Sequence, residues 1–186
     1  MTGLAKVFWG LLLVFFDFRI EGFDVLPDVA GFIVVYLGFS QLSAHHSSFH
    51  KAKIASLPLL VLSILDLFSF RFQFEIGLSI PNESGDAIGL IVGLAAAALY
   101  LYMVYHLCKG IEHMAQRAGF VELQQKANRR WQYYLWANIV ILLCSILAVG
   151  VPMLIGPLII PLIVVGVVVY ILILVLVYQG DQVLKV

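Results

Sequence analysis

The sequence predicts an all-α fold: one transmembrane domain over residues 1–186, a polytopic bundle of about six helices. Three observations predict it. Of the 186 residues, 62% are hydrophobic and 12% are charged, whereas soluble domains carry about 45–50% apolar and about 25% charged residues. Apolar stretches alternate with short polar breaks, and lysine and arginine gather in every second break. The excess apolar surface must face lipid, so the bilayer is the first predicted partner.

The apolar stretches define the expected helices in chain order. A helix needs about 20 apolar residues to cross a bilayer, with a range of about 17–25, and the first three stretches are close to the lower limit. The predicted spans are residues 4–20, 28–44, 54–70, 87–108, 134–151 and 157–178. Between the fourth and fifth spans, apolar residues at helical spacing predict a cytoplasmic helical hairpin over residues 109–131, broken at Gly119.

The connection before the last span leaves two structures open. The stretch Val151-Pro152-Met153-Leu154-Ile155-Gly156-Pro157 is uncharged and apolar. Residues 151–161 form either a tight turn at the outer surface or a re-entrant segment buried in protein, because irregular backbone cannot face lipid. Pro161 lacks a backbone donor and is expected to kink the last helix.

The placement of basic residues predicts the orientation. Nine of the eleven fall on one side of the predicted membrane: Lys6, Lys51, Lys53, Lys109, Arg117, Lys126, Arg129, Arg130 and Lys185. Because cytoplasmic loops carry the excess of lysine and arginine, both termini are expected in the cytoplasm of a multi-pass plasma-membrane protein. The zero net charge and the lack of a basic aromatic stripe predict no nucleic-acid partner.

Charged residues collect at the predicted outer ends of the first three spans. The candidate ligand- or ion-binding residues are Asp17, Arg19, Glu21, Asp24, Asp28, Asp66 and Arg71. Asp17 and Asp66 fall within apolar stretches, and a charge near the bilayer centre costs roughly 2.5–3.5 kcal/mol. Pairing Asp17 with Arg71 and Asp66 with Arg19 across neighbouring helices lowers that cost. Asp28 is expected to act as the N-cap of the second helix.

Three interpretations of this acidic outer cluster stay open. The ion pairs either tie three helices together, or line an outward-facing pocket for a cation or polar solute, or the charges snorkel independently to the headgroups. Carboxylate oxygens are the ligands that hard cations prefer, and paired carboxylates can relay protons. The sequence identifies neither a particular metal nor a cofactor.

The stretch Gly22-Phe23-Asp24-Val25-Leu26-Pro27-Asp28 resembles an element of small multi-pass membrane proteins of Gram-positive bacteria whose activity is unassigned. The resemblance covers only the N-terminal part of the chain and contains no catalytic signature. It implies a bacterial plasma-membrane setting and no particular substrate. The chain length and helix number are also similar to those of the substrate-binding subunits of energy-coupling-factor vitamin transporters.

Two further features have a structural and a functional interpretation. Gly89-Leu90-Ile91-Val92-Gly93, followed by alanines, forms a small-residue face that serves either internal packing or contact with a second copy or a membrane partner. His45, His46 and His50 share one cytoplasmic break. They are expected to be solvated loop residues, because no cysteine or carboxylate nearby completes a metal site.

These features favour transport, or solute and ion binding related to transport, through the acidic outer cluster. The alternative is a non-transporting membrane regulator, assembly factor or immunity partner that uses the basic cytoplasmic hairpin. A third candidate is a membrane enzyme acting on lipid or peptide. It is less favoured, because no nucleophile–base pair, phosphate-binding loop or zinc-protease motif stands out, and no catalytic residue is assigned.

Overall fold

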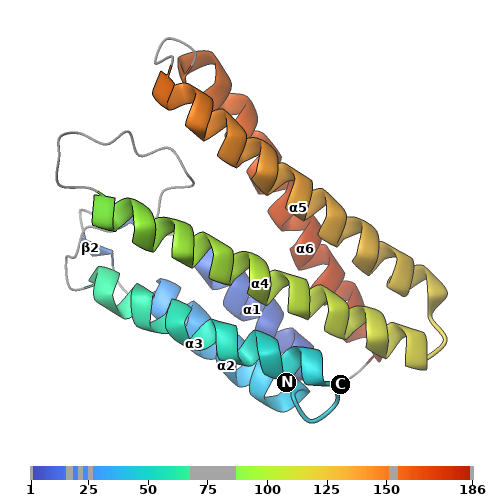
Figure 1. The fold of residues 1–186 in the computed structure, drawn as a ribbon. Coiled ribbons are helices and arrows are strands. Elements are labelled where there is room, and N and C mark those ends of the chain that lie inside the picture. The colour runs from blue at the N-terminus through green and yellow to red at the C-terminus, as the bar shows by residue number, and fades with distance from the viewer. Residues whose placement is uncertain are drawn as a thin grey trace.

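The computed structural model is a bundle of six helices with one small β-hairpin (Figure 1). It describes the backbone of residues 2–15, 19–20, 23–24, 27–67, 87–150 and 155–184, and the side chains of residues 2–15, 28–65, 91–144 and 160–184. The elements are α1 (Gly3–Phe15), β1 (Arg19–Ile20), β2 (Phe23–Asp24), α2 (Pro27–Leu42), α3 (Ser47–Leu67), α4 (Ala87–Arg117), α5 (Val121–Gly150) and α6 (Ile155–Leu184).

Three of the helices are long and apolar enough to cross a bilayer, counted over the described residues. They contain the segments Ser47–Leu65, Ile91–Arg117 and Ile160–Leu184. The apolar helices α1 and α2 are shorter, with 13 and 16 residues. Large apolar side chains also lie on the protein surface, among them Ile160, Ile91 and Trp136, each more than 60% exposed. These features support the predicted membrane protein of the all-helical class.

Successive helices run in opposite directions along the bundle (Figure 1). At one end lie the α2–α3 turn, the α4–α5 turn and both chain termini (Figure 1). We call this the basic end, after Lys51, Lys109, Arg117, Lys126 and Arg129. Thr2 donates a hydrogen bond to Asp181 there, and Arg117 donates one to the carbonyl of His45, which connects elements distant in sequence.

Four helices extend further toward the basic end than the apolar stretches alone predict. α3 begins at Ser47 rather than near residue 54, because its lysines are accommodated within the helix. Lys53 donates to the hydroxyl of Ser40 at 3.0 Å, and its ammonium lies 5.0 Å from the ring centre of Tyr36. In α5, Lys126 pairs with Glu122 at 2.6 Å, one turn away. Hydropathy locates only the part of a helix that contacts lipid, whereas the helix continues past it.

The first helix is shorter than predicted. α1 ends at Phe15, and residues 19–20, expected to be helical, form strand β1 instead. β1 pairs antiparallel with β2 in a register that places Arg19 opposite Asp24 and Ile20 opposite Phe23. Strand pairing satisfies backbone groups where the chain reverses before α2. This β-hairpin was not predicted from the sequence.

The break between α4 and α5 lies where the sequence predicts it. Gly119 has φ = 77°, a left-handed conformation that favours glycine. Phe120 donates to the carbonyl of Ala115 at 2.9 Å, and Gly119 to that of Gln116 at 3.2 Å, which is the Schellman pattern that ends a helix. At the other doubtful connection, residues 155–161, including Pro161, belong to α6, and residues 151–154 lie outside the described part.

Glycines let α1 and α2 approach until their backbones touch. A Cβ atom built on Gly10 would lie 2.7 Å from the carbonyl oxygen of Gly31, and one on Gly31 would lie 2.9 Å from that of Gly10. Gly3 and Gly38 form a second reciprocal pair of this kind, two helical turns nearer the basic end. On each helix the two glycines are seven residues apart, so they share one face. Small residues at such positions allow close helix packing in membranes.

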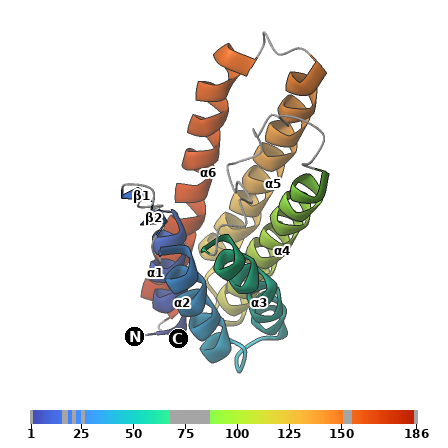
Figure 2. The ribbon, with the colours of Figure 1, turned by 90° about the vertical axis from the view of Figure 1, so that its left-hand side faces the viewer.

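This α1–α2 hairpin runs beside only half of α6 (Figure 2). Near the basic end Leu4 contacts Gly180, and at the far end of α1 the ring of Phe15 stacks on Tyr170 with centroids 4.8 Å apart. α1 has 13 residues and α6 has 30, which correspond to about 20 Å and about 45 Å. The far end of the hairpin is therefore level with the middle of α6.

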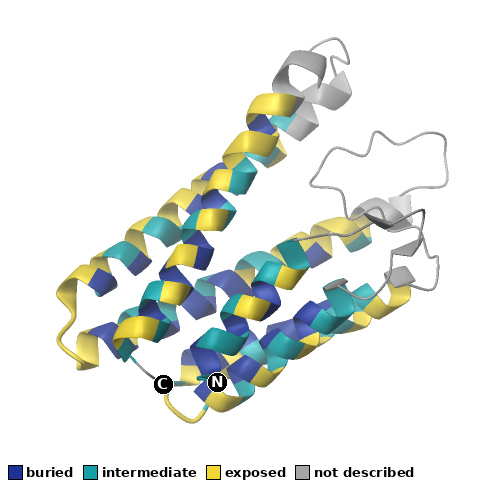
Figure 3. Ribbon diagram, turned by 180° about the vertical axis from the view of Figure 1, so that it is seen from behind, coloured by how far each residue is buried: buried dark blue, intermediate teal, exposed yellow. Residues whose placement is uncertain are grey.

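The buried core lies in the half of the bundle nearer the basic end (Figure 3). Among the largest fully buried side chains are Phe39, Phe49, Met103, Ile111 and Leu176. Beyond the α1–α2 hairpin, the described parts of α4, α5 and α6 are mostly exposed, as at Ile91, Leu143 and Ile160. The tightly packed half is thus the one in which all six helices take part.

Gly10→Ala is expected to destabilise the protein by about 1–3 kcal/mol, because the new methyl group meets backbone atoms that cannot move aside. Gly93→Ala is the matched control, because nothing lies within 4 Å of a Cβ there. It should leave stability unchanged or raise it by up to about 1 kcal/mol through helix propensity. Thermal unfolding in detergent, followed by circular dichroism, measures both. Equal melting temperatures for the two variants would contradict the glycine contact.

Candidate functional site

Of the seven residues predicted to bind a ligand or ion, only Asp28 has a described side chain. The backbone places Arg19 and Asp24 on the paired strands β1 and β2 and Asp66 in the last turn of α3. The other three, Asp17, Glu21 and Arg71, lie outside the described residues. The predicted pairs Asp17–Arg71 and Asp66–Arg19 therefore also fall outside the described side chains and stay predictions.

Asp28 lies in the first turn of α2 rather than before it. The helix begins at Pro27, whose fixed φ suits the first helical position. The sequence predicted an N-cap at Asp28, and in the structure the helix starts one residue earlier. The carboxylate still benefits from the positive end of the helix dipole. Its Oδ1 atom is buried, while the residue as a whole is partly exposed.

A chain of hydroxyl groups lies beside Asp28. Tyr100 of α4 donates to the hydroxyl of Tyr170 in α6 at 3.2 Å, and Tyr170 donates to the carbonyl of Leu11 in α1 at 2.7 Å. The ring of Tyr170 is held by the stacked ring of Phe15. Since each hydroxyl is both a donor and an acceptor, these hydrogen bonds connect three helices and strengthen one another.

The carboxylate of Asp28 is close enough to interact electrostatically with Tyr100 and Tyr170. We call Asp28, Tyr100, Tyr170 and the Leu11 carbonyl the tyrosine–aspartate cluster. It brings together α1, α2, α4 and α6 at the level where α1 ends, about half-way along α6. One carboxylate and two hydroxyls supply the oxygen ligands that a small cation uses, and they can also carry a proton.

The sequence analysis did not predict Tyr100 and Tyr170 as site residues, although their positions in the sequence contain a signal. Aromatic residues of membrane helices usually lie at the interfaces with water, where their polar tips reach the headgroups. Tyr100 and Tyr170 instead occupy the middle of the apolar stretches 87–108 and 157–178. A hydroxyl at such a position needs a partner inside the protein, so a central tyrosine in a span predicts a polar contact between helices.

On the predicted small-residue face of α4, Gly93 does not pack against any other part of the chain that the structure describes. Gly93 is exposed and has no atom within 4 Å of the Cβ position, and Ala97 and Ala98 are exposed as well. Close internal contacts are instead made by the glycines of α1 and α2 and by Gly110, which faces Phe49. Contact of the Gly89–Gly93 face with a second copy or a membrane partner stays a prediction.

The described residues give no sign of a multidentate metal centre. No group of three or more His, Cys, Asp or Glu side chains in this part of the chain could hold a metal ion together. The carboxylates at positions 17, 21, 24 and 66 lie outside that search. Among the described residues, the tyrosine–aspartate cluster is therefore an oxygen-rich polar site with one carboxylate.

No protein-family model matches the chain, and no curated protein or solved structure shows significant similarity to it. Any function therefore has to follow from the chemistry of its own residues. The tyrosine–aspartate cluster joins polar groups of four helices about half-way along α6.

Tyr170→Phe should lower the free energy of unfolding by about 1 kcal/mol, because it removes one hydrogen bond to Leu11 and leaves the Tyr100 hydroxyl without its acceptor. For a chain of this size that corresponds to a fall in melting temperature of about 2–4 °C. Tyr178→Phe is the matched control on the same helix, because Tyr178 is 51% exposed. The hydroxyl chain is refuted if the two variants melt at the same temperature.

Proposed function

We propose that this protein crosses a bacterial plasma membrane with six helices and both termini in the cytoplasm, and that it binds a small cation or polar solute in a transport-related role. The ligand enters from the outer side and reaches Asp28 of the tyrosine–aspartate cluster. The basic end is then the cytoplasmic end, which agrees with the excess of lysine and arginine on cytoplasmic loops.

The depth of Asp28 is the observation that carries this proposal. α1 ends at the level of Tyr170, 14 residues before the last residue of α6 at Leu184. If α6 spans a hydrocarbon core about 30 Å thick, the cluster lies well below the outer surface. A carboxylate at such a depth is costly unless a protein group, water, a cation or a proton compensates it, and intramembrane carboxylates generally mark ion or substrate pathways.

The remaining predicted carboxylates fit the same pathway. Asp17, Glu21 and Asp24 lie in the segment that joins α1 to α2, directly before Asp28 in the chain, and Asp66 lies in the last turn of α3. In chain order, all of them fall in the last turn of a helix or in a connection between helices that does not belong to the basic end. They would form an acidic vestibule that attracts cations and leads them to Asp28.

A second candidate function is that of a membrane regulator or assembly partner. It is favoured by a separate cavity of about 400 Å³ at the basic end, between the α4–α5 turn and the end of α6. Phe120 and Val121 on its rim are 45% and 60% exposed. Apolar side chains beside a cavity on a polar protein end suit a protein partner, whereas a transporter does not require them.

The proposed topology predicts that positions near Asp24 are accessible from outside the membrane and that the turns of the basic end are accessible only from the cytoplasm. With Cys108 and Cys144 replaced by alanine, a cysteine at Asp24 should react with a membrane-impermeant maleimide added outside right-side-out vesicles. Cysteines at His45 and at Phe120, both exposed in turns of the basic end, should react only after permeabilisation. Labelling of the Asp24 position from the inside alone would reverse the orientation and remove the external site.

Cation binding at Asp28 should appear as thermal stabilisation. In detergent, sodium, potassium, magnesium or calcium chloride should raise the melting temperature of the native chain above that in choline chloride of equal ionic strength. At ten times the dissociation constant the stabilisation is about 1.4 kcal/mol, or roughly 3–5 °C. Asp28→Asn should abolish the difference, because the amide keeps the shape of the carboxylate but loses its charge.

Glu122→Gln is the matched control for this experiment, because Glu122 is an exposed carboxylate on the basic end. It should keep the full response to the cation. The same response in all three proteins would locate the effect outside the tyrosine–aspartate cluster. If no cation raises the melting temperature above that in choline chloride, a cation is excluded as the ligand. The maleimide labelling in vesicles still determines the orientation independently.

A further inference from the structure

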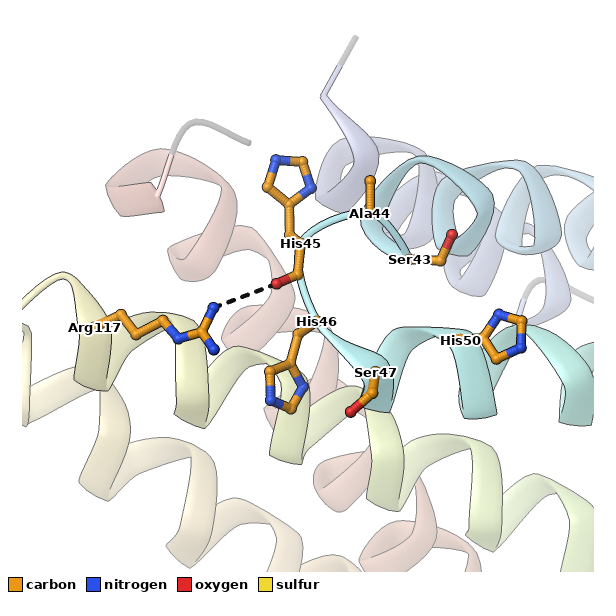
Figure 4. A pocket seen from close by; sticks show the side chains of 7 residues that line it. All are labelled: Ser43, Ala44, His45, His46, Ser47, His50 and Arg117. Atoms are coloured by element: carbon orange, nitrogen blue, oxygen red, sulfur yellow. Dashed lines mark hydrogen bonds between the residues drawn. The ribbon is translucent and has the colours of Figure 1, made fainter.

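A second cavity, of about 500 Å³, lies between the α2–α3 turn, the first turn of α3 and the last residue of α4. Figure 4 shows the residues that line it, and we call it the turn pocket. Arg117 reaches the turn from α4, His45 and His46 project to opposite sides of the turn, and His50 lies one turn into α3 (Figure 4). Ser43 and Ser47 add hydroxyl groups.

Contacts on the protein side hold the main groups in place. The Nη1 atom of Arg117 donates to the carbonyl of His45 at 3.5 Å, so the guanidinium is positioned at the turn and keeps its other N–H groups for a ligand. The Nδ1 atom of His46 accepts the backbone N–H of Ser48 at 3.1 Å. Its ring also stacks on His113 of α4, with centroids 4.6 Å apart. In the neutral ring the proton is then on Nε2, which can donate.

The electrostatic surroundings of the turn pocket favour an anion. Its lining contains one arginine and three histidines and no carboxylate among the residues that the structure describes. The pKa of His46 lies below its usual 6.5, through burial first and then through the nearby His113 and Arg117. The contributions of His113 and Arg117 agree with the positive character of the lining. A cation would face the same repulsion, and no three ligating side chains meet here for a metal.

We propose that the turn pocket binds a phosphate group through the guanidinium of Arg117 and the imidazole of His46. A guanidinium matches the oxygens of a phosphate with two parallel hydrogen bonds, and imidazole N–H groups and serine hydroxyls can bind the remaining oxygens. The phosphate belongs either to an anionic lipid headgroup, since the turn pocket lies where α2, α3 and α4 end, or to a soluble phosphate compound. Both sources present the same chemistry to these residues.

The experiment uses the full chain with ¹⁵N-labelled histidines in phosphatidylcholine nanodiscs. In one arm inorganic phosphate is titrated against chloride at constant ionic strength, and in the other phosphatidylglycerol replaces part of the phosphatidylcholine. In at least one arm the imidazole signals of His46 and His113 should shift saturably. The pKa of His46 should rise there, because the bound anion offsets Arg117 and His113 of α4 and the flanking His45 and His50. The arm that responds identifies the source of the phosphate.

Arg117→Gln should weaken this binding roughly tenfold, the loss expected for a hydrogen bond to a charged group. Arg129→Gln is the matched control, because Arg129 is an exposed arginine of the basic end that does not line the turn pocket. If Arg117→Gln does not fold, as judged by circular dichroism, Arg117→Lys provides the same comparison, because it keeps the charge and loses the two parallel hydrogen bonds. The proposal is overturned if neither arm shifts the His46 signal, or if the pocket variant and Arg129→Gln lose binding equally.

Discussion

The backbone contact between α1 and α2 is the constraint on which the rest of the structure depends. Two reciprocal glycine pairs, Gly3 with Gly38 and Gly10 with Gly31, bring these helices close enough for backbone atoms of one to face the glycines of the other. The resulting hairpin is thin and short, and it packs beside only the half of α6 nearer the basic end. Its far end therefore brings polar groups to the middle of the long helices, where an ordinary spanning hairpin would carry apolar side chains.

The structure separates two polar regions by a layer of fully buried apolar side chains. The tyrosine–aspartate cluster lies on one side of this layer and the turn pocket on the other. Val7, Val35, Phe39, Leu107 and Leu176, each with no exposed surface, lie between them along their helices. In a transporter, a solute held at Asp28 could reach the basic end only after this layer rearranges.

The helical class and the order of the elements could be predicted from the apolar stretches, whereas the helix ends could not. Hydropathy registers contact with lipid, and helices such as α3 continue past it when a lysine like Lys53 finds a hydroxyl and an aromatic ring within the protein. The break at Gly119 was predictable, because a left-handed residue is a local requirement of the chain. The pairing of residues 19–20 with residues 23–24 was not, since strands this short leave no alternating apolar pattern in the sequence.

The sequence by itself determined the apolar helical class, the collection of basic residues at alternate breaks and the presence of carboxylates near helix ends, because these are properties of composition and spacing. Only the tertiary structure decided which glycines pack and which polar groups meet. Gly93 and Gly10 both lie within apolar stretches of the sequence. In the structure Gly93 faces open space, whereas Gly10 faces the backbone of α2. Tyr100 and Tyr170 likewise meet although they are 70 residues apart in the chain. Such partners come from distant helices, and local spacing contains no information about the distance between them.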